Sequence, residues 1–362
     1  WASDGVLGWS RWIDAAQRAG DLLAATVLGA GPGQTLVCDT TSVNFYQLCD
    51  AAVSARPGRN TIITDAANFP TDRYILEGIA ERRGMRLVLI DNTSDGEVVS
   101  PDMLAAYLDD DVALVSLQVV QYRAGGRQDV RTLTHLAREH GALMVWDAAH
   151  AVGSVELDLD ANGVDLAVGC TYKYLNSGPG APAWMYVNNR MQEELRVPIQ
   201  GWFAQADQFA MGPRFDKADG IRGFQVASPS LMGITCVMSS LELIAEAGID
   251  ALASKAAQGT EYMISLYDGL LAEHDMALQT PRDPRQRGGH ITLGHPSALA
   301  ISTALRETHH VITDFRAPDG IRVAMSPLAN SFTEIWDGFQ KIRDCLVRRT
   351  YDDVAVQPGK VT

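Results

Sequence analysis

The sequence predicts an α/β protein with two domains of unequal size. Short apolar runs rich in Val, Ile and Leu alternate with amphipathic stretches along the first part of the chain, a pattern typical of a mostly parallel sheet sandwiched between helices. After Pro229, two long helical patterns and several shorter elements predict a smaller C-terminal α+β domain. We place the large domain at residues 26–238 and the small domain at 239–350. A helical segment over 1–25 is expected to pack on the small domain, and 351–362 to form a loose tail.

The predicted strands of the large domain are short, rich in Val, Ile and Leu, and bounded by Gly, Asp or Asn, as buried strands are. They span residues 35–37, 61–64, 86–90, 112–120, 142–146, 164–168 and 183–187. Amphipathic helices are predicted between many of them, at residues 44–53, 73–82, 101–108 and 130–139. In the small domain we expect helices at 233–247, 249–274, 297–308 and 331–349, and strands at 276–279, 290–294 and 320–325.

Charge and cysteine content exclude several classes of function. Thirty Lys and Arg against 44 Asp and Glu give a net charge of −14, and so acidic a surface repels nucleic-acid backbones and anionic lipid. Five cysteines without a CxxC pair argue against a disulfide framework or a structural zinc site and fit a reducing cytoplasm. The histidines also lack the spacing of a zinc helix, so we expect no metal.

Targeting signals are not visible in the sequence. No apolar run approaches the ~20 residues that a membrane span needs, and no stretch has the character of a signal peptide. The chain starts at Trp1 instead of Met, so we expect N-terminal residues to be missing.

Asp147 and Lys173 are the most informative pair of residues. Asp147 ends a predicted apolar strand, and ligands of open α/β sheets bind outside the carboxyl ends of strands. Lys173 follows the next strand and precedes a Gly-Pro-Gly turn, and a desolvated lysine is a nucleophile for Schiff-base chemistry. Alone, the aspartate could cap a turn and the lysine could reach the surface. Together they suit pyridoxal phosphate, with the lysine on its aldehyde and the aspartate on its ring nitrogen.

Other segments could complete such a site. Thr41 and Ser42 follow a strand and open a helix, where hydroxyls and backbone N–H groups form an anion site, although a simple N-cap has the same pattern. Phe69 could stack on a flat ring or plug the core. Arg322, in a short predicted strand, could clamp a carboxylate bidentately or form a structural ion pair. The aromatic residues at 201–203 could bind an aromatic ligand or seal a domain junction.

In combination these segments resemble the kynureninase family of fold type I pyridoxal-phosphate enzymes. The similar segments are Asn-Phe-Pro-Thr-Asp at 68–72, Trp-Asp-Ala-Ala-His-Ala-Val-Gly at 146–153, Thr-Tyr-Lys-Tyr-Leu-Asn at 171–176, Gly-Trp-Phe at 201–203 and Gly-Ile-Arg-Val-Ala at 320–324. They occur in the family's order and span most of the chain. The resemblance implies hydrolytic Cβ–Cγ cleavage of L-kynurenine, 3-hydroxykynurenine or a ring-substituted analogue, which gives an anthranilate and L-alanine.

The resemblance also implies a role for individual residues. Lys173 would bind the cofactor covalently and act in catalysis with Tyr172. The remaining cofactor-binding residues would be Thr41, Ser42, Phe69, Asp72, Gln118, Asp147, His150, Trp202 and Ser228, with Thr41, Ser42 and Tyr172 at the phosphate. Arg322 would hold the substrate carboxylate, and Tyr122, Trp202 and Ser228 would also contact substrate. The family works as a cytoplasmic homodimer with sites near the subunit interface, in tryptophan catabolism by the kynurenine pathway and in NAD biosynthesis.

Departures from the family pattern leave some questions open. Ala204 replaces a glycine, Ser228 stands where Asn or Thr is usual, and Gln118 stands where Ser or Thr is frequent near the phosphate. The preferred ring substituent therefore stays open, as does the choice between primary catabolism and a secondary-metabolite pathway. The alternatives are a desulfurase-like or aminotransferase-like enzyme and an inactive binding protein of the same fold. A desulfurase needs a reactive loop cysteine, whereas Cys345 and Cys236 lie in predicted helices.

Overall fold

The computed structural model describes residues 2–93 and 95–355, and its larger sheet has the strand order β1-β7-β6-β5-β4-β2-β3. The neighbouring pairs from β6 to β3 are parallel, whereas β7 runs antiparallel to both β1 and β6. The prediction of a mostly parallel sheet is confirmed. The strands are β1 (Thr35–Val37), β2 (Thr61–Asp65), β3 (Arg86–Ile90), β4 (Val112–Gln118), β5 (Leu143–Asp147), β6 (Leu166–Gly169) and β7 (Trp184–Val187).

Helices cover this sheet, and capping side chains fix where several of them begin. The Thr40 hydroxyl accepts a hydrogen bond from the Val43 N–H at the start of α3, and Asp129 accepts one from the Thr132 N–H at the start of α6. Each cap satisfies a backbone donor that the first helical turn leaves free. The helices are α1 (Trp9–Trp12), α2 (Ala15–Leu23), α3 (Thr41–Ser54), α4 (Pro70–Arg83), α5 (Pro101–Ala105), α6 (Val130–Glu139) and α7 (Asn189–Gln192).

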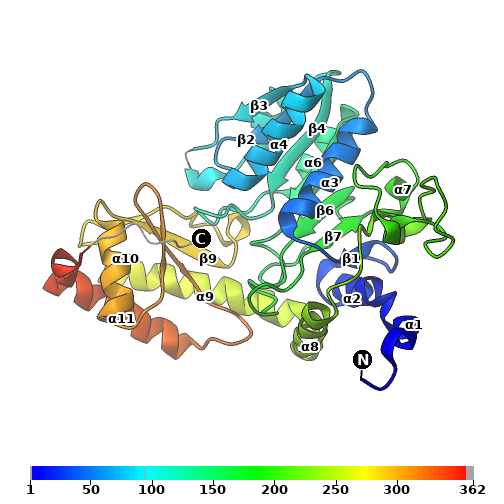
Figure 1. Cartoon of the computed structure of the whole chain (residues 1–362). Coiled ribbons are helices and arrows are strands. Elements are labelled where there is room, and N and C mark those ends of the chain that lie inside the picture. Colours follow the sequence, from blue (N-terminus) through cyan, green and yellow to red (C-terminus); the bar gives the residue numbers. More distant parts are fainter. Residues whose placement is uncertain (1, 94, 356–362) are drawn as a thin grey trace.

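The C-terminal part forms a smaller, antiparallel sheet of order β10-β11-β9-β8 with its own helices. Figure 1 shows α8 and α9 leading from the large unit to the small one, where α10 and α11 lie. The strand β10 was not predicted, because a three-residue Asp-Phe-Arg segment carries no apolar run. The elements are α8 (Leu231–Ala247), α9 (Ile249–Leu270), β8 (Ala277–Leu278), β9 (His290–Gly294), α10 (Ala298–Glu307), β10 (Asp314–Arg316), β11 (Gly320–Ala324) and α11 (Phe332–Arg348).

The two units have separate hydrophobic cores. The larger core continues through the buried face of α8 as far as Leu252, and the smaller one runs from Met263 to Tyr351. The division at residue 238 therefore stays a proposal, since α8 packs with the large sheet. Tyr351, at the start of the predicted tail, is buried against the second core, and the expected looseness of the residues after it stays a prediction. The rest of the predicted tail, from residue 356 onward, lies outside the described residues.

The N-terminal helix α2 packs against β1 and α8. Its buried residues belong to the larger core, as does the buried face of α8, and the packing of this segment on the small domain stays a prediction. The approach to β1 is close: a Cβ on Gly20 would lie 2.0 Å from the carbonyl oxygen of Thr35. A glycine is required there because a side chain would collide with the strand backbone.

One segment of the large unit, 123–127, is joined by hydrogen bonds to the small unit. The Thr280 hydroxyl donates to the carbonyl of Ala124 at 2.6 Å, and the Thr292 hydroxyl donates to that of Arg123. The backbone N–H of Arg127 donates to the carbonyl of Gln286 at 2.8 Å. The small unit thus holds this segment near both of its ends. The segment lies just beyond β4, past the carboxyl edge of the large sheet.

Within the described residues, no individual helix combines the length and hydropathy of a membrane span; α8 and α9 do so only when taken together, across an 82° bend.

Candidate active site

Lys173 lines a cavity of about 420 Å³ between the two units. It shares the cavity wall with His150 from the large unit and with Arg322 and His290 from the small one. The Lys173 Nζ lies 2.9 Å from the His150 Nε2, and the Arg322 Nη1 lies 3.5 Å from the same nitrogen. Three of the predicted site residues therefore meet at one point, although they come from distant parts of the sequence.

His150 is an acceptor in this arrangement. Burial, followed by the positive charges of Lys173 and Arg322, lowers the pKa of its imidazole well below 6.5. The ring is therefore neutral, and because its Nε2 faces two cationic donors, the proton is assigned to Nδ1. A neutral His150 gives Lys173 a hydrogen-bond partner without adding a third positive charge.

The two histidines that line the cavity, His150 and His290, are expected to make the cofactor-free protein less stable below pH 6.5. Burial and nearby cations lower both pKa values in the folded state, so the unfolded chain binds more protons there. Their stabilising contribution is complete above the unfolded pKa of about 6.5 and falls by about 1.4 kcal/mol per histidine at pH 5.5. Urea unfolding at pH 7.5 and 5.5 measures this loss. In His290→Asn the loss of unfolding free energy between pH 7.5 and 5.5 is expected to be smaller by about the contribution of one histidine. An unchanged loss would contradict the assignment of a lowered pKa to His290.

Asp147 and Asp72 form a pair of buried carboxyl groups at the carboxyl edge of the large sheet. Asp147 ends β5, and its Oδ1 accepts the Ala149 N–H at 2.7 Å. Burial raises the pKa of Asp72 well above its usual value, and the negative charge of Asp147 raises it further, while Lys173 partly offsets this. The Oδ2 of Asp72 is buried without a hydrogen-bond partner among the described residues. Asp72 therefore holds a proton more readily than an exposed aspartate does.

Gln118 ends β4 and is buried next to Asp147. Its Nε2 donates to the Asp147 Oδ2 at 3.3 Å, and its Oε1 accepts the Tyr122 N–H at 3.2 Å. The sequence predicts that Gln118 lies near the phosphate, and this stays a prediction; in the structure its side chain supports Asp147. The hydrogen bond that Gln118 donates to the Asp147 Oδ2 is long, so this oxygen keeps capacity for another donor.

Arg322, in β11, is held in place by its neighbours. Its Nε and Nη2 donate to the two carboxylate oxygens of Asp314, at 3.1 and 2.6 Å, and its Nη1 donates to the carbonyl of Tyr122 at 2.6 Å. These bonds engage three of the five N–H groups of a guanidinium. Both interpretations of Arg322 thus have support: it forms a structural ion pair, and it retains donors on Nη1 and Nη2 for an anion in the cavity.

Phe69 and the two predicted tyrosines lie around this region. Phe69 precedes α4 and packs edge-to-face on Tyr122, with ring centroids 5.3 Å apart. Tyr122 is partly buried, and burial raises the pKa of its hydroxyl. Tyr172 is about half exposed, and burial together with Cys170 raises its pKa to about 12. Both hydroxyls therefore keep their protons at neutral pH.

The predicted phosphate residues Thr41 and Ser42 begin α3 after β1. The capping hydroxyl belongs to Thr40, so the side chains of Thr41 and Ser42 are not used by the cap. Because β1 is parallel to β5 and β6, α3 begins at the carboxyl edge of the sheet. Asp147 lies at this edge, and Lys173 follows the end of β6 there. The first N–H groups of the helix are available to an anion there.

Trp202 and Ser228 do not line the cavity. Trp202 begins a short 3₁₀ turn, Trp202–Ala204, is 43 % exposed, and packs edge-to-face on Phe203 and Phe209. Ser228 is exposed in the segment before α8. Phe203 is buried, so of the two aromatic residues at 201–203 only Trp202 is exposed. Within one chain, therefore, these predicted contacts are not brought together with Lys173.

Sequence reasoning missed Asp314, His290 and Arg316. Asp314 orients Arg322, and Arg316 donates to the same carboxylate at 3.0 Å. Both Asp314 and Arg316 belong to β10, which was not predicted. His290 opens β9 and lines the cavity. Its only sequence signal is a histidine at the start of an apolar strand, a common pattern in ordinary cores.

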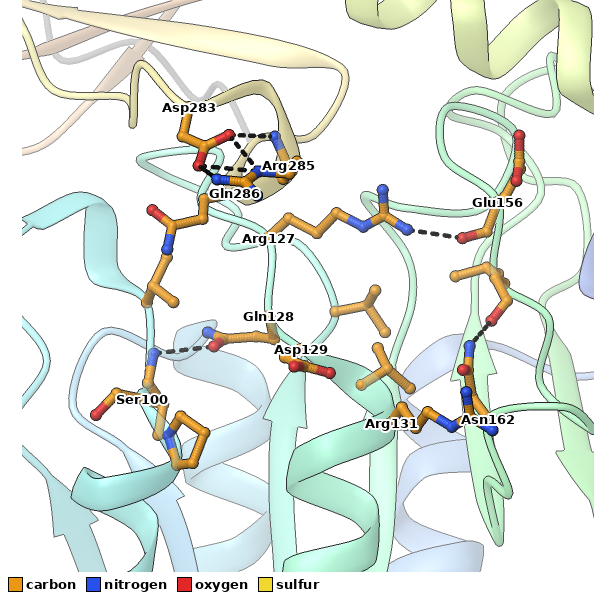
Figure 2. Close-up of a pocket in the computed structure, with 16 residues that line it drawn as sticks. Ser100, Arg127, Gln128, Asp129, Arg131, Glu156, Asn162, Asp283, Arg285 and Gln286 are labelled. Carbon is orange, nitrogen blue, oxygen red and sulfur yellow. Dashed lines mark hydrogen bonds and ion pairs between the residues drawn. The ribbon is translucent and has the colours of Figure 1, made fainter.

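A larger cavity of about 670 Å³ lies elsewhere and contains none of the predicted site residues. Figure 2 shows it between the turn that carries Asp283 and Arg285 and the start of α6 at Asp129. Arg127 crosses it and donates to the Glu156 carbonyl at 3.0 Å. Three cationic and three anionic side chains line it, so no one ligand charge is favoured.

The residues around Lys173 fit pyridoxal phosphate. The amine of Lys173 lies at the cavity wall beside a neutral histidine, as a Schiff base requires. The unpartnered carboxylate oxygen of Asp72 and the weakly bonded Oδ2 of Asp147 leave room for one protonated ring nitrogen between buried acids. The start of α3 supplies N–H groups and hydroxyls for a phosphate.

Comparison with known proteins agrees with this geometry. Residues 252–342 match the family model described as the kynureninase C-terminal domain. The chain is 36 % identical over 365 residues to a kynureninase of Pseudomonas fluorescens, and the match covers 99 % of this chain and 85 % of that protein. It is 35 % identical over 354 residues to a kynureninase of Burkholderia pseudomallei (strain 1106a), with coverage of 96 % of this chain and 83 % of the relative.

Solved structures with low sequence identity share the fold. A cysteine desulfurase from Thermococcus onnurineus superposes with a TM-score of 0.83 at 16 % identity, covering 96 % of this chain and 87 % of that one. The cystine C-S lyase C-DES does so with a TM-score of 0.82 at 19 % identity, covering 94 % and 89 %. These likenesses confirm the fold type. The two relatives at 35 and 36 % identity show the family as well: the chain belongs to the kynureninase family.

Proposed function

We propose that this protein is a pyridoxal-phosphate-dependent hydrolase that cleaves the Cβ–Cγ bond of L-kynurenine, 3-hydroxykynurenine or a ring-substituted analogue. The products are an anthranilate and L-alanine. The observation that carries the proposal is the placement of Lys173 and Arg322 on one cavity, 2.9 and 3.5 Å from the same nitrogen of His150. The amino group of an α-amino acid would take the place of Lys173 on the cofactor aldehyde, and Arg322 lies close enough to that position to hold the carboxylate of the same molecule.

Each residue has a definite task in this reaction. When bound, pyridoxal phosphate supplies the electron sink that makes protons at Cα and Cβ acidic. Asp147 holds the proton of the ring nitrogen, and Gln118 fixes the orientation of that carboxylate. The Lys173 Nζ binds the cofactor at rest and then moves the Cα proton, while His150 accepts a hydrogen bond from it. Arg322 holds the substrate carboxylate through its remaining N–H groups, and Tyr172 is proposed to assist as a protonated hydroxyl.

The proposal is tested with purified protein supplied with pyridoxal phosphate. We expect turnover of L-kynurenine, measured as anthranilate fluorescence, with L-alanine in equal amount. A comparison of kcat/KM for kynurenine, 3-hydroxykynurenine and methylated analogues identifies the preferred ring substituent. Release of sulfide from cysteine, or amino-group transfer without anthranilate, would contradict the proposal.

The five cysteines do not favour a desulfurase. Cys345 and Cys170 are buried, and burial raises the pKa of both thiols. The exposed Cys236 lies within α8 and does not line the cavity. A thiol that is protonated, or held on a helix away from Lys173, cannot serve as the reactive loop nucleophile.

Asp314 is a positioning residue for Arg322. In Asp314→Asn the carboxylate that pairs with two guanidinium nitrogens is lost. We expect KM for kynurenine to rise about tenfold or more, since a charge-assisted bidentate pair is worth roughly 1.5–3 kcal/mol, while kcat changes less. Asp268→Asn removes an equally bidentate but exposed partner of Arg282 and serves as the control. Equal effects in the two variants would contradict this role.

We also propose a homodimer with sites near the subunit interface, in the cytoplasm and in tryptophan catabolism. Exposed apolar side chains support the dimer: Phe209 and Met211 are 65 and 75 % exposed, close in sequence to Trp202. The rings of Trp202 and Phe209 pack against each other at the surface, and exposed apolar patches mark interaction sites. The absence of disulfides among all five cysteines supports a reducing compartment.

A further inference from the structure

His290 is a cavity residue to which the reaction as described gives no task. It is the first residue of β9 and lines the same cavity as Lys173 and Arg322. Its ring packs edge-on against the ring of His150, with centroids 5.4 Å apart and planes at 62°. His290 therefore lies one ring away from the nitrogen that both Lys173 and Arg322 approach.

The imidazole of His290 is buried but not satisfied. The residue is 1 % exposed, and neither Nδ1 nor Nε2 has a partner in good hydrogen-bond geometry among the described residues, although the backbone of Arg123 is close enough to oppose the lowering of its pKa. A buried polar group without a partner costs roughly 1–3 kcal/mol, and such groups in a native protein need an explanation. The other buried histidine of this unit, His295, does have a partner, because its Nδ1 accepts the Ser297 N–H at 2.9 Å.

The fold makes room for this ring. Gly125 has a φ of +75°, and a Cβ there would lie 3.2 Å from the Cδ2 and Nε2 of His290 and 2.7 Å from its carbonyl oxygen. A glycine with left-handed backbone thus stands where any side chain would press on the imidazole. The histidine is accommodated by its surroundings even though they leave its nitrogens unpaired.

The charges around His290 indicate what it could bind. Burial and the positive charges of Arg322 and Lys173 lower its pKa well below 6.5, so the ring is neutral and has one N–H donor and one acceptor. An oxygen that gains negative charge during a reaction is favoured among such cations. A neutral imidazole is a suitable donor to this oxygen, since it can donate a hydrogen bond without giving up its proton.

We propose that His290 donates a hydrogen bond to the oxygen on the γ-carbon of the substrate, the carbonyl to which water adds. This rests on the proposed function. With the α-amino group at Lys173 and the carboxylate at Arg322, the γ-oxygen is only three bonds from Cα, whereas ring substituents are farther away. His150 lies between Lys173 and Arg322, and His290 packs on His150. His290 is therefore expected to reach the γ-oxygen more readily than the ring substituents. His290 keeps its proton throughout, and its role is to stabilise the oxygen as it becomes anionic.

The test compares two substrate analogues that cannot undergo Cβ–Cγ cleavage, one with a γ-methoxy group and one with a γ-ethyl group of similar size. Dissociation constants are measured by calorimetry on the cofactor-loaded protein. We expect the wild type to bind the γ-methoxy analogue about tenfold more tightly than the γ-ethyl analogue, and His290→Phe to lose this preference. His290→Gln, which keeps a donor, is expected to restore part of it, and the control His295→Phe to retain it. For kynurenine itself, kcat should fall about 10²-fold in His290→Phe, with a much smaller change in KM.

Three results would overturn the proposal. The first is a wild type without preference between the analogues. The second is a preference that persists in His290→Phe, and the third is equal loss for both analogues in that variant, which indicates a purely structural role. Thermal unfolding of the variants shows whether they are folded. Because binding is measured without turnover, these outcomes are distinguishable from a failure of the protein to cleave kynurenine.

Discussion

Replacing Lys173 with alanine is expected to lower kcat for kynurenine by roughly 10³-fold or more. Lys173 is the amine at the cavity wall, bonded to His150 at 2.9 Å. The variant loses both the covalent attachment of the cofactor and the base that moves the Cα proton, and among the described residues no other lysine lines the cavity. Anthranilate fluorescence measures the loss. Borohydride reduction followed by peptide mapping is expected to label position 173 in the wild type and to leave the variant unlabelled.

Lys217→Ala is the matched control for this experiment. Lys217 is also a partly buried lysine, with its Nζ bonded to the Gln192 carbonyl at 2.8 Å and lying 4.6 Å from the centre of the Phe224 ring. It does not line the cavity, so turnover should stay within a few fold of the wild type. A label at any position other than 173, or undiminished turnover in Lys173→Ala, would disprove the assigned attachment site.

Asp147→Asn is expected to lower kcat about 10²–10³-fold while the protein still folds. The asparagine keeps the shape of the side chain and an oxygen for the Ala149 N–H, but it has no charge to keep a ring nitrogen protonated. Without that proton the cofactor is a weaker electron sink. Steady-state kinetics give the loss, and the absorbance of the bound cofactor shows that binding itself persists.

Asp65→Asn provides a control of the same kind. Asp65 is also buried and also ends a parallel strand of the large sheet, β2. It is bonded by Asn92 and Gln121, and burial raises its pKa to about 6. We expect its replacement to change kcat by less than about tenfold. If Asp65→Asn and Asp147→Asn lowered kcat equally, general disturbance of buried carboxyl groups would explain the result, and the assignment of Asp147 would fail.

The large sheet and its edge were predictable from the sequence for a simple physical reason. Buried parallel strands are continuous apolar runs, and residues that follow them fall at one edge. The apolar runs alone therefore place Asp147 at the end of β5 and Lys173 just beyond β6, on the same edge. The start of α6 at Val130 was also predicted, whereas the hydrophobic pattern placed the start of α3 at residue 44 instead of Thr41, since the cap Thr40 acts through a side-chain hydrogen bond that such a pattern does not record.

Residues supplied by the small unit were not predictable in the same way. His290 and Asp314 belong to short strands, and they reach the cavity only because the small sheet packs against the segment that follows β4. No periodicity in the sequence encodes that contact. Trp202 and Ser228 show the opposite limit: a family resemblance assigns them to the site, whereas the geometry of a single chain leaves both away from the cavity.

The segment 123–127 sets the separation between the group that binds the amino end of a substrate and the group that binds its acid end. Threonines of the small sheet hold the backbone of this segment, and Arg322 bonds to the neighbouring carbonyl of Tyr122. None of these bonds depends on the aryl ring of the substrate. Evolution toward a different ring could therefore reshape the opposite wall freely, whereas a mutation in this segment would weaken the binding of every amino acid alike.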